Sequence, residues 1–335
     1  EIKQAIQDEY FSKNGRSTIH TQTAYVVALH FDLVPAEVKD RVLKDLQALL
    51  KRSNMHLKTG FIGTPYLCRT LSDHGASDSS YQIFFQEDYP SWLYEVLMGA
   101  TTIWERWNSI LPNGKISGTD MNSLNHYAYG SIVEWMYRHM CGINPREDAP
   151  GFQKFVLKPE VYGKLHYAKA TLRSVMGLIE SGWSREKDGS LMIKVTVPFN
   201  TEAELYLPDA DRTKVEGMEG LTAEQIGEKV KVSLEAGTYS FCYVPKKNYE
   251  LFYSIETPLK ELLANHETKA VLGELTPKLL SMVAGEGLGV ELPYCIADIV
   301  DGSNDFLANM LFEGQLDRKT LEERLKAVPV VVRSV

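Results

Sequence analysis

The sequence lacks the features of two large classes of protein, those that bind nucleic acids and those that span membranes. Its 335 residues carry 36 Lys and Arg against 44 Asp and Glu, which gives a net charge of −8. A surface that binds a phosphate backbone is usually basic, so this balance argues against nucleic acid. No apolar run reaches the roughly 18–20 residues of a bilayer-spanning helix. We therefore expect neither a nucleic-acid partner nor a membrane.

Cysteine is scarce, and no metal or cofactor motif is present. The four cysteines lie far apart without a CxxC spacing: Cys68, Cys141, Cys242 and Cys295. Such spacing favours free thiols, and therefore a reducing, cytoplasmic compartment, over a disulfide framework. There is no zinc motif, no Ser-His-Asp arrangement and no GxxxxGK[ST] phosphate loop. We expect no metal and no cofactor.

The start of the chain also lacks a signal-peptide pattern, and its first residue is Glu1 rather than methionine. Because a helical pattern begins at once, we expect the natural N-terminus to lie upstream. The sequence therefore leaves export open.

Residues 1–144 have the pattern of a helical domain. The spacing is clearest in 36–52, where one apolar face is formed by Val38, Val42, Leu46, Leu49 and Leu50. Thr64-Pro65 and Pro90 are typical of helix starts. We expect helices near 1–13, 22–33, 36–52, 64–74, 77–87, 90–98 and 122–141, the last capped by Asn122, and loops at 53–63 and 99–121.

Residues 145–247 change to a period of two, which is typical of strands. Alternation is clearest in 191–197, 203–207 and 239–244, and Glu186–Gly189 predicts a hairpin turn. Roughly eight short strands indicate an antiparallel β-sandwich. We expect its aromatic residues to lie in the core or on a sheet face, with a sugar-binding face as the alternative: Trp183, Tyr206, Phe241 and Tyr243.

Residues 248–335 return to helical spacing and predict a small helical appendage. Thr257-Pro258 and Thr276-Pro277 open short helices, and 316–328 forms a third. The sequence gives this region no derivable function. Docking or dimerisation is a hypothesis, and a homo-oligomer stays open.

The best candidate for chemistry is Glu105, in the loop Gly99-Ala-Thr-Thr-Ile-Trp-Glu-Arg-Trp-Asn108. Its neighbours Trp104 and Trp107 could stack on a sugar, and Arg106 could hold the carboxylate by paired hydrogen bonds. A carboxylate in such a setting can activate water. A surface ion pair between Glu105 and Arg106, flanked by two core tryptophans, explains the pattern equally well.

A second polar and aromatic cluster follows in Asn122-Ser-Leu-Asn-His-Tyr-Ala-Tyr-Gly130. Asn125 and His126 could bind sugar hydroxyls near a helix N-terminus, where backbone donors favour polar ligands. The alternative is a capping cluster with a core histidine. A third segment, Thr59–Tyr66, places two glycines around Phe61, which lets backbone approach a ligand, or simply makes a turn into a helix.

The order of these motifs resembles the bacterial α-L-rhamnosidases of glycoside hydrolase family 78. The matching strings are Thr21-Gln-Thr-Ala-Tyr25, Thr59-Gly-Phe-Ile-Gly-Thr-Pro-Tyr66, Tyr89-Pro-Ser-Trp92, Gly99–Trp107 and Met121–Gly130. The resemblance covers residues 1 to about 245. It implies the later half of a catalytic (α/α)6 barrel followed by the C-terminal β-sandwich.

The resemblance implies an inverting hydrolase that acts on rhamnose-containing oligosaccharides or glycosides. By it, Glu105 is the general base and His126 contacts the rhamnose, while Trp104, Trp107 and Asn125 are candidates for the lining. The general acid of the family lies in an Asp-x-x-x-Arg-x-Glu-Arg-x-Gly-Trp motif, which this sequence lacks.

Seven expected helices are also about half of the twelve that such a barrel requires. We therefore expect a fragment that lacks the N-terminal half of the barrel and is inactive alone. Two alternatives remain: a non-catalytic carbohydrate-binding or assembly protein, and an (α/α)6 hydrolase that acts on another sugar.

Overall fold

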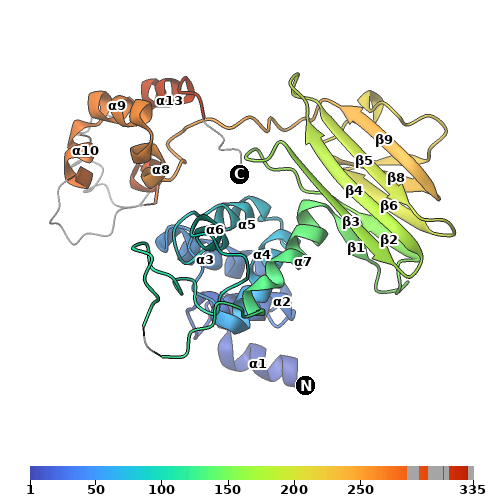
Figure 1. Cartoon of the computed structure of the whole chain (residues 1–335), viewed down its shortest axis with the longest axis horizontal. Helices are drawn as coiled ribbons and strands as arrows, with labels where there is room; N and C mark the ends of the chain where they lie inside the picture. The colour runs from blue at the N-terminus through green and yellow to red at the C-terminus, as the bar shows by residue number, and fades with distance from the viewer. Residues whose placement is uncertain (119, 285–293, 301–311, 313–316, 331–335) are drawn as a thin grey trace. The chain divides into compact units, whose positions relative to one another are not determined.

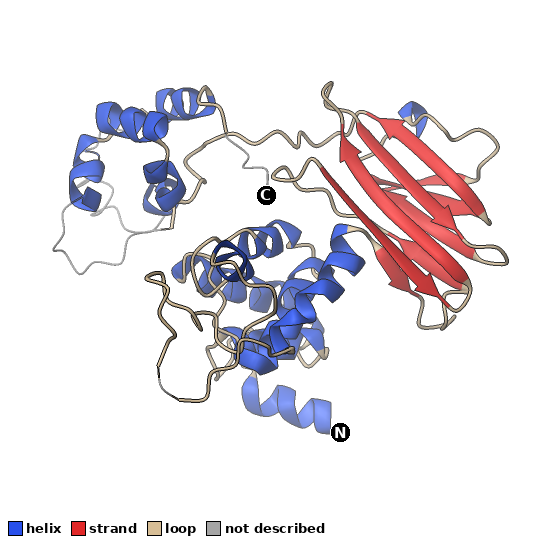
Figure 2. Ribbon diagram, in the orientation of Figure 1, coloured by secondary structure: helices blue, strands red, loops and turns tan. Residues whose placement is uncertain are grey.

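The fold is that of a computed structural model, which describes residues 1–118, 120–284, 294–300, 312 and 317–330. The chain divides into two compact units, residues 1–50 with 55–249 and residues 51–54 with 250–335 (Figure 1). Within the first unit, helices precede strands, as the sequence predicts (Figure 2).

The helical part of the first unit packs around α4 (Gly60–Asp73), which contacts α2, α5, η2 and α7. Its side chains Leu67, Cys68 and Leu71 are buried. The other elements of this part are α1 (Ile2–Tyr10), α2 (Gln22–His30), the 3-10 turn η1 (Ala36–Val38), α3 (Lys39–Arg52), α5 (Ser77–Phe84), α6 (Trp92–Leu97), the 3-10 turn η2 (Ala128–Ser131), α7 (Ile132–Trp135) and the π-helical turn η3 (Met136–Met140).

Two of the expected helix starts are wrong. The buried face of α4 extends upstream through Gly63 and Thr64, so the helix begins at Gly60 and Pro65 lies inside it. The helix expected at 122–141 begins only at Ala128. Asn122 caps no helix, because its side chain is bonded to a preceding loop.

Two sheets form the predicted sandwich. One has the order β1-β2-β6-β8-β7 and the other the order β3-β4-β5-β9. The strands are β1 (Ile143–Pro145), β2 (Lys154–Leu157), β3 (Tyr167–Ser174), β4 (Gly177–Arg185), β5 (Leu191–Val197), β6 (Glu202–Leu207), β7 (Ala223–Ile226), β8 (Lys229–Leu234) and β9 (Gly237–Tyr243). Pairing is antiparallel except between β2 and β6, which are parallel, so the purely antiparallel expectation is wrong at this pair.

The sandwich core follows from the period-two pattern. In β5, Leu191, Ile193, Val195 and Val197 are buried while the side chains between them are not. The predicted hairpin joins β4 to β5, and Gly189 takes a positive φ within its turn. Three of the four aromatic residues assigned to core or sheet face, Trp183, Phe241 and Tyr243, are buried, and Tyr206 is half-buried.

The sandwich completes the end of the last helix of the helical part. The final carbonyls of a helix have no partner within it. Here Trp183 Nε1 donates to Met140 O at 2.8 Å and Ser181 Oγ donates to Cys141 O at 2.6 Å. Gly142 then turns the chain into β1 with φ +81°, and a Cβ there would lie 2.2 Å from Pro159 N. Only glycine fits this crossing between the two parts.

The second unit is helical. Its described helices are α8 (Leu259–Ala264), α9 (His266–Leu275), α10 (Pro277–Ala284), α11 (Ile296–Val300) and α13 (Arg318–Lys326). The starts expected at Thr257-Pro258 and Thr276-Pro277 are confirmed. The expected helix 316–328 matches α13, and Leu316 lies outside the described residues. Among the helices that the structure describes, none is both long and apolar enough to cross a membrane.

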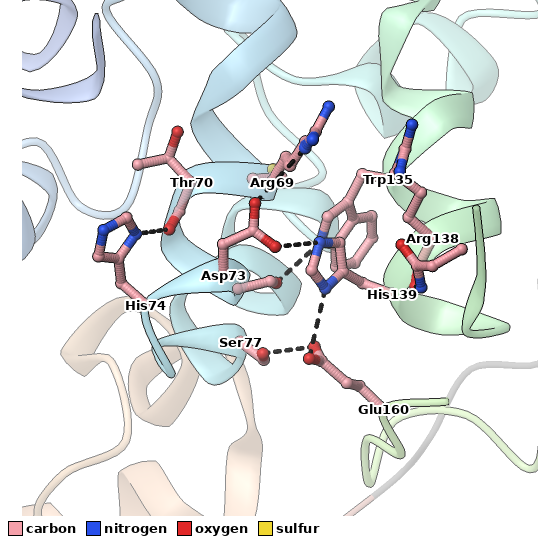
Figure 3. Close-up of polar contacts among 12 residues, drawn as sticks. Arg69, Thr70, Asp73, His74, Ser77, Trp135, Arg138, His139 and Glu160 are labelled. Carbon is pink, nitrogen blue, oxygen red and sulfur yellow. Dashed lines mark hydrogen bonds and ion pairs between the residues drawn. The ribbon is translucent and has the colours of Figure 1, made fainter. Parts of the chain in front are cut away.

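A charge cluster around the buried His139 also joins the helical part to the sandwich (Figure 3). His139 of η3 is 7% exposed, and its Nδ1 lies 3.3 Å from Glu160 Oε1, in the segment between β2 and β3. Its Nε2 lies 3.3 Å from Asp73 Oδ1 at the end of α4, in an ionic contact without hydrogen-bond alignment. Ser77 Oγ of α5 donates to Glu160 Oε2. One imidazole ring is thus held between two carboxylates.

The cluster favours the charged form of each member. Burial lowers the pKa of His139, but the two carboxylates more than offset this and raise it overall. Burial raises the pKa values of Asp73 and Glu160, but the imidazolium, with Arg69 on Asp73 and Ser77 on Glu160, lowers both overall. Each group is therefore held in the ion pair over a wider range of pH than it would be in water.

We predict that His139→Gln destabilises the first unit by about 3 kcal/mol near pH 5.5, because it leaves the largely buried Glu160 carboxylate without its cation. The raised pKa of His139 gives a contribution that is complete below its ordinary value of 6.5 and is lost as pH rises through the folded value. The lowered pKa of Glu160 gives a second stabilising contribution, which is complete above its ordinary value of 4.5 and is lost as pH falls. Urea unfolding at pH 5.5 and pH 8.5 measures the His139 contribution, because the Glu160 contribution is complete at both pH values.

The matched control is His74→Gln, since the His74 ring donates to the Thr70 carbonyl rather than to a carboxylate. The difference between the two variants should shrink at the higher pH. An equal loss at both pH values would contradict the assignment of a charged His139.

Candidate functional site

An open pocket of about 500 Å³ lies in the helical part of the first unit. It is built from the start of α4, the segment before α6, the loop after α6 and the turn η2. Its lining residues are Phe61, Tyr89, Pro90, Glu105, Arg106, Trp107, Asn108 and Tyr129. The first and third sequence clusters, which contain Glu105 and Phe61, therefore meet at one place.

Two loop segments, 102–105 and 123–126, run side by side beneath this pocket through backbone hydrogen bonds. Glu105 N donates to Ser123 O at 2.9 Å, and His126 N donates to Ile103 O at 2.8 Å. Thr102 Oγ1 donates to Leu124 O in a further contact. The pairing brings Glu105 and His126 onto neighbouring segments although they are far apart along the chain.

The carboxylate of Glu105 is oriented by the same pairing. Its Oε2 accepts the Ser123 amide at 2.8 Å, whereas Oε1 accepts no hydrogen bond from the described residues. No ion pair joins Glu105 to Arg106 in the part of the chain that the structure describes, so neither the bidentate clamp nor the surface pair expected from the sequence is formed. Glu105 is half-buried, with one oxygen fixed and one available at the pocket.

The two tryptophans beside Glu105 have different surroundings. Trp107 lines the pocket, and its ring stacks on Tyr129 at 4.0 Å between centroids and 15° between planes. Trp104 is 2% exposed and lies outside the lining. Its amide donates to Glu95 Oε2 at 3.2 Å. Trp107 thus belongs to the pocket surface and Trp104 to its support.

His126 lies within a row of stacked rings. Its imidazole is parallel to Phe61, at 5.0 Å and 5°, and to Tyr127, at 5.7 Å and 7°. Phe61 in turn contacts Tyr129 at 5.0 Å. Because Phe61 and Tyr129 both line the pocket, the row connects His126 to it. Offset and parallel ring pairs hold the imidazole plane in one orientation.

The two asparagines of the second cluster differ in role. Asn125 is exposed, and its side chain makes no hydrogen bond to the described residues. Asn122 bonds to the loop after α6 by three contacts: Nδ2 donates to Ser109 O and Ser117 O, and Oδ1 accepts from Ser109 Oγ at 2.6 Å. Asn122 thus closes the loop that carries Glu105.

Sequence reasoning missed two parts of the site. Tyr89-Pro90 appears in the motif order but was not assigned to the lining. Glu95, in the interior of α6, was not considered at all, since a glutamate in a short helix has no pattern that marks it as buried. Burial raises the pKa of Tyr129, and the charge of Glu95 raises it further, which links this carboxyl to the pocket.

Comparison with known families matches both parts of the first unit. Residues 1–140 match the family described as bacterial alpha-L-rhamnosidase 6 hairpin glycosidase domain, and residues 142–222 match the bacterial alpha-L-rhamnosidase C-terminal domain. The second match ends before β8 and β9, which complete the two sheets of the sandwich.

Individual relatives carry the same name. An alpha-L-rhamnosidase of Streptomyces avermitilis is 38% identical over 219 residues, 65% of this chain and 21% of that protein. One from Alteromonas sp. (strain LOR) is 39% identical over 242 residues, 72% of this chain and 26% of that protein. The chain thus spans 21% to 26% of the length of these two relatives.

Solved structures agree with these matches. The Streptomyces avermitilis alpha-L-rhamnosidase complexed with L-rhamnose has a TM-score of 0.68 at 36% identity, over 72% of this chain and 23% of that chain. The native enzyme from Aspergillus terreus has a TM-score of 0.64 at 32% identity, over 72% and 26%.

We predict that Asn122→Ala loosens the loop after α6, because three hydrogen bonds to Ser109 and Ser117 are lost. Amide hydrogen exchange of residues 106–118 should rise about tenfold, which corresponds to about 1.4 kcal/mol of local stability. Asn125→Ala is the matched control and should leave exchange unchanged. Equal exchange in the two variants would argue against this role for Asn122.

Proposed function

The chain belongs to the bacterial α-L-rhamnosidases through its six-hairpin and C-terminal domains, and we propose that it contributes the water-activating side of an inverting α-L-rhamnosidase pocket. The observation that carries the proposal is Glu105 at a pocket beside the stacked pair Trp107 and Tyr129. Flat aromatic faces with few polar groups suit a sugar ring, and a carboxylate with an available oxygen suits proton removal from water.

In this proposal Glu105 is the general base. The base of an inverting hydrolase takes a proton from water as the water attacks the anomeric carbon. The hydrogen bond from the Ser123 amide to Oε2 orients the carboxylate and leaves Oε1 for that water. The reaction also needs an acid about 6.5–9.5 Å away to protonate the leaving oxygen. We assign that acid to no residue of this chain.

We assign substrate contact to His126, whose ring plane is fixed between Phe61 and Tyr127. A fixed imidazole can hydrogen-bond a sugar hydroxyl without first losing rotational freedom. Trp107 and Tyr129 provide the apolar face of the pocket. Trp104 supports the loop from within the core, and Asn125 is an exposed polar residue next to His126, outside the pocket lining.

The proposed division of roles follows three regions. Residues 1–144 carry the pocket, and residues 145–247 support it through the contacts of Trp183, Ser181 and Glu160 with the helical part. Residues 248–335 form the helical appendage, for which docking or dimerisation stays a hypothesis. This chain spans 21% and 26% of two rhamnosidase relatives, and we propose hydrolysis for the polypeptide that carries these residues.

We predict that Glu105→Gln lowers hydrolysis of an aryl α-L-rhamnoside by about 10²–10⁴-fold, because the amide cannot accept a proton from water. Turnover is measured on the natural polypeptide that carries these residues, and product configuration is followed by NMR. Affinity for L-rhamnose should change little, since the side-chain shape is kept.

Glu37→Gln, an exposed change on η1, is the control and should leave turnover unchanged. Activity of Glu105→Gln within threefold of the unsubstituted protein would end the base assignment. Rhamnose binding without turnover in the unsubstituted natural polypeptide would favour a non-catalytic carbohydrate-binding protein instead. A panel of aryl glycosides tests for another sugar.

We also predict that His126→Ala weakens L-rhamnose binding about fivefold to tenfold, the effect of one lost hydrogen bond. His126 is not itself in the pocket lining but stacks on the lining residue Phe61, whereas His20 is exposed and its ring contacts Tyr25, so His20→Ala is the matched control. Isothermal titration with L-rhamnose measures both. Equal affinities for the two variants would exclude His126 from the sugar site.

A further inference from the structure

Glu95 is a buried carboxyl group that the proposed reaction does not use. It lies on α6 and is 1% exposed. Its Oε2 accepts the Trp104 amide at 3.2 Å, and its Oε1 is buried without a hydrogen-bond partner among the described residues. A buried polar atom without a hydrogen bond destabilises the fold, so its presence calls for an explanation. Its one directed contact is with the residue next to Glu105.

We propose that Glu95 is a positioning residue for Glu105 and holds the backbone that carries the base through the hydrogen bond from the Trp104 amide. The proposal rests on the function proposed for Glu105. Three successive residues of this backbone are each tethered. Ile103 O and Glu105 N bond to the 123–126 segment, and Trp104 N bonds to Glu95.

The hydrogen bonds of these three residues alternate in direction, which explains why an acceptor from α6 is needed. The 123–126 segment takes the bonds of Ile103 and Glu105. Trp104 then presents its amide in the other direction, where the chain is buried and water is excluded. Without Glu95 that amide would be unpaired in the core, at a cost of about 1–3 kcal/mol.

Burial also explains how a carboxyl group is tolerated there. Loss of hydration raises the pKa of Glu95 to about 7, and the hydrogen bond from the Trp104 amide lowers it by less. Below this pKa the neutral acid still accepts the amide through Oε2 and places no charge behind the pocket. The facing titratable group is Tyr129, whose own pKa is raised by burial and by Glu95. Glu95 thus supplies a hydrogen-bond acceptor rather than a second base.

The test compares four variants of the natural polypeptide. Glu95→Leu removes the acceptor, and Glu95→Asp shortens the side chain by one methylene so that it no longer reaches the amide. Glu95→Gln keeps an acceptor of the same length. Tyr94→Phe is the matched control, because it removes a hydrogen bond from the same helix to the same loop at Ile110, away from Glu105.

A shift of about 1 Å in a catalytic group can cost about 100-fold in rate. We expect Glu95→Leu and Glu95→Asp to lower kcat for an aryl α-L-rhamnoside by about 10-fold to 100-fold with KM within twofold. Glu95→Gln and Tyr94→Phe should keep kcat within threefold. Loss of kcat and a rise in KM together, or a loss in Glu95→Gln equal to that in Glu95→Leu, would overturn the positioning role.

A second measurement is independent of activity. Amide exchange at Trp104 and Glu105 should rise about tenfold in Glu95→Leu and Glu95→Asp and stay unchanged in Glu95→Gln. The infrared carbonyl band of a buried protonated carboxyl should disappear in Glu95→Gln. If the unsubstituted protein shows no turnover, the proposed function fails while these readouts still decide whether Glu95 holds the loop. Unchanged exchange in Glu95→Leu would overturn the inference even in an active enzyme.

Discussion

The pairing of residues 102–105 with residues 123–126 is the interaction on which the site depends. Neither segment belongs to a helix or a strand, so neither has regular hydrogen bonds of its own. The pairing satisfies Glu105 N and His126 N and also orients the Glu105 carboxylate through the Ser123 amide. Functional residues are often carried by loops on a rigid scaffold. Here the loops gain their rigidity from each other.

The helical part provides the fixed frame for these loops, and the sandwich stabilises that frame. Trp183 and Ser181 donate hydrogen bonds to the last carbonyls of the helix that begins next to the pocket, at η2 and α7. His139, on the same helix, is fixed between Asp73 of α4 and Glu160 beyond β2. α4 also carries Phe61 at its opposite end. The helix that contacts the sandwich is therefore the one that begins at the pocket, and through His139 it is joined to α4, whose other end lines the pocket.

The sequence predicted element type well and local geometry poorly, for physical reasons. Periodicity reports which side chains are buried along one element, so it located the helices, the sandwich and the 186–189 hairpin. It does not report where a polar side chain finds its partner. Asn122 is compatible with a helix cap, but its amide bonds to a loop thirteen residues earlier. No sequence pattern marks Glu95 as buried. Its partner, the Trp104 amide, lies in an irregular loop, and periodicity does not predict contacts with such loops.

The order of residue types in the sequence identified Glu105 as the candidate base. Comparison of its environment with that of Glu95 shows why Glu105 suits that role better. Glu95 lies on α6, and Glu105 lies on the loop that follows it. Glu95 accepts a hydrogen bond from the amide of Trp104, the residue before Glu105. Burial has raised the pKa of Glu95 to about 7, and its Oε2 accepts a backbone amide. Glu105 is half-buried at a pocket, with one oxygen fixed by a backbone donor. Two carboxyl groups in different environments take different roles, and here the environment, rather than the residue type, decides which one can meet water.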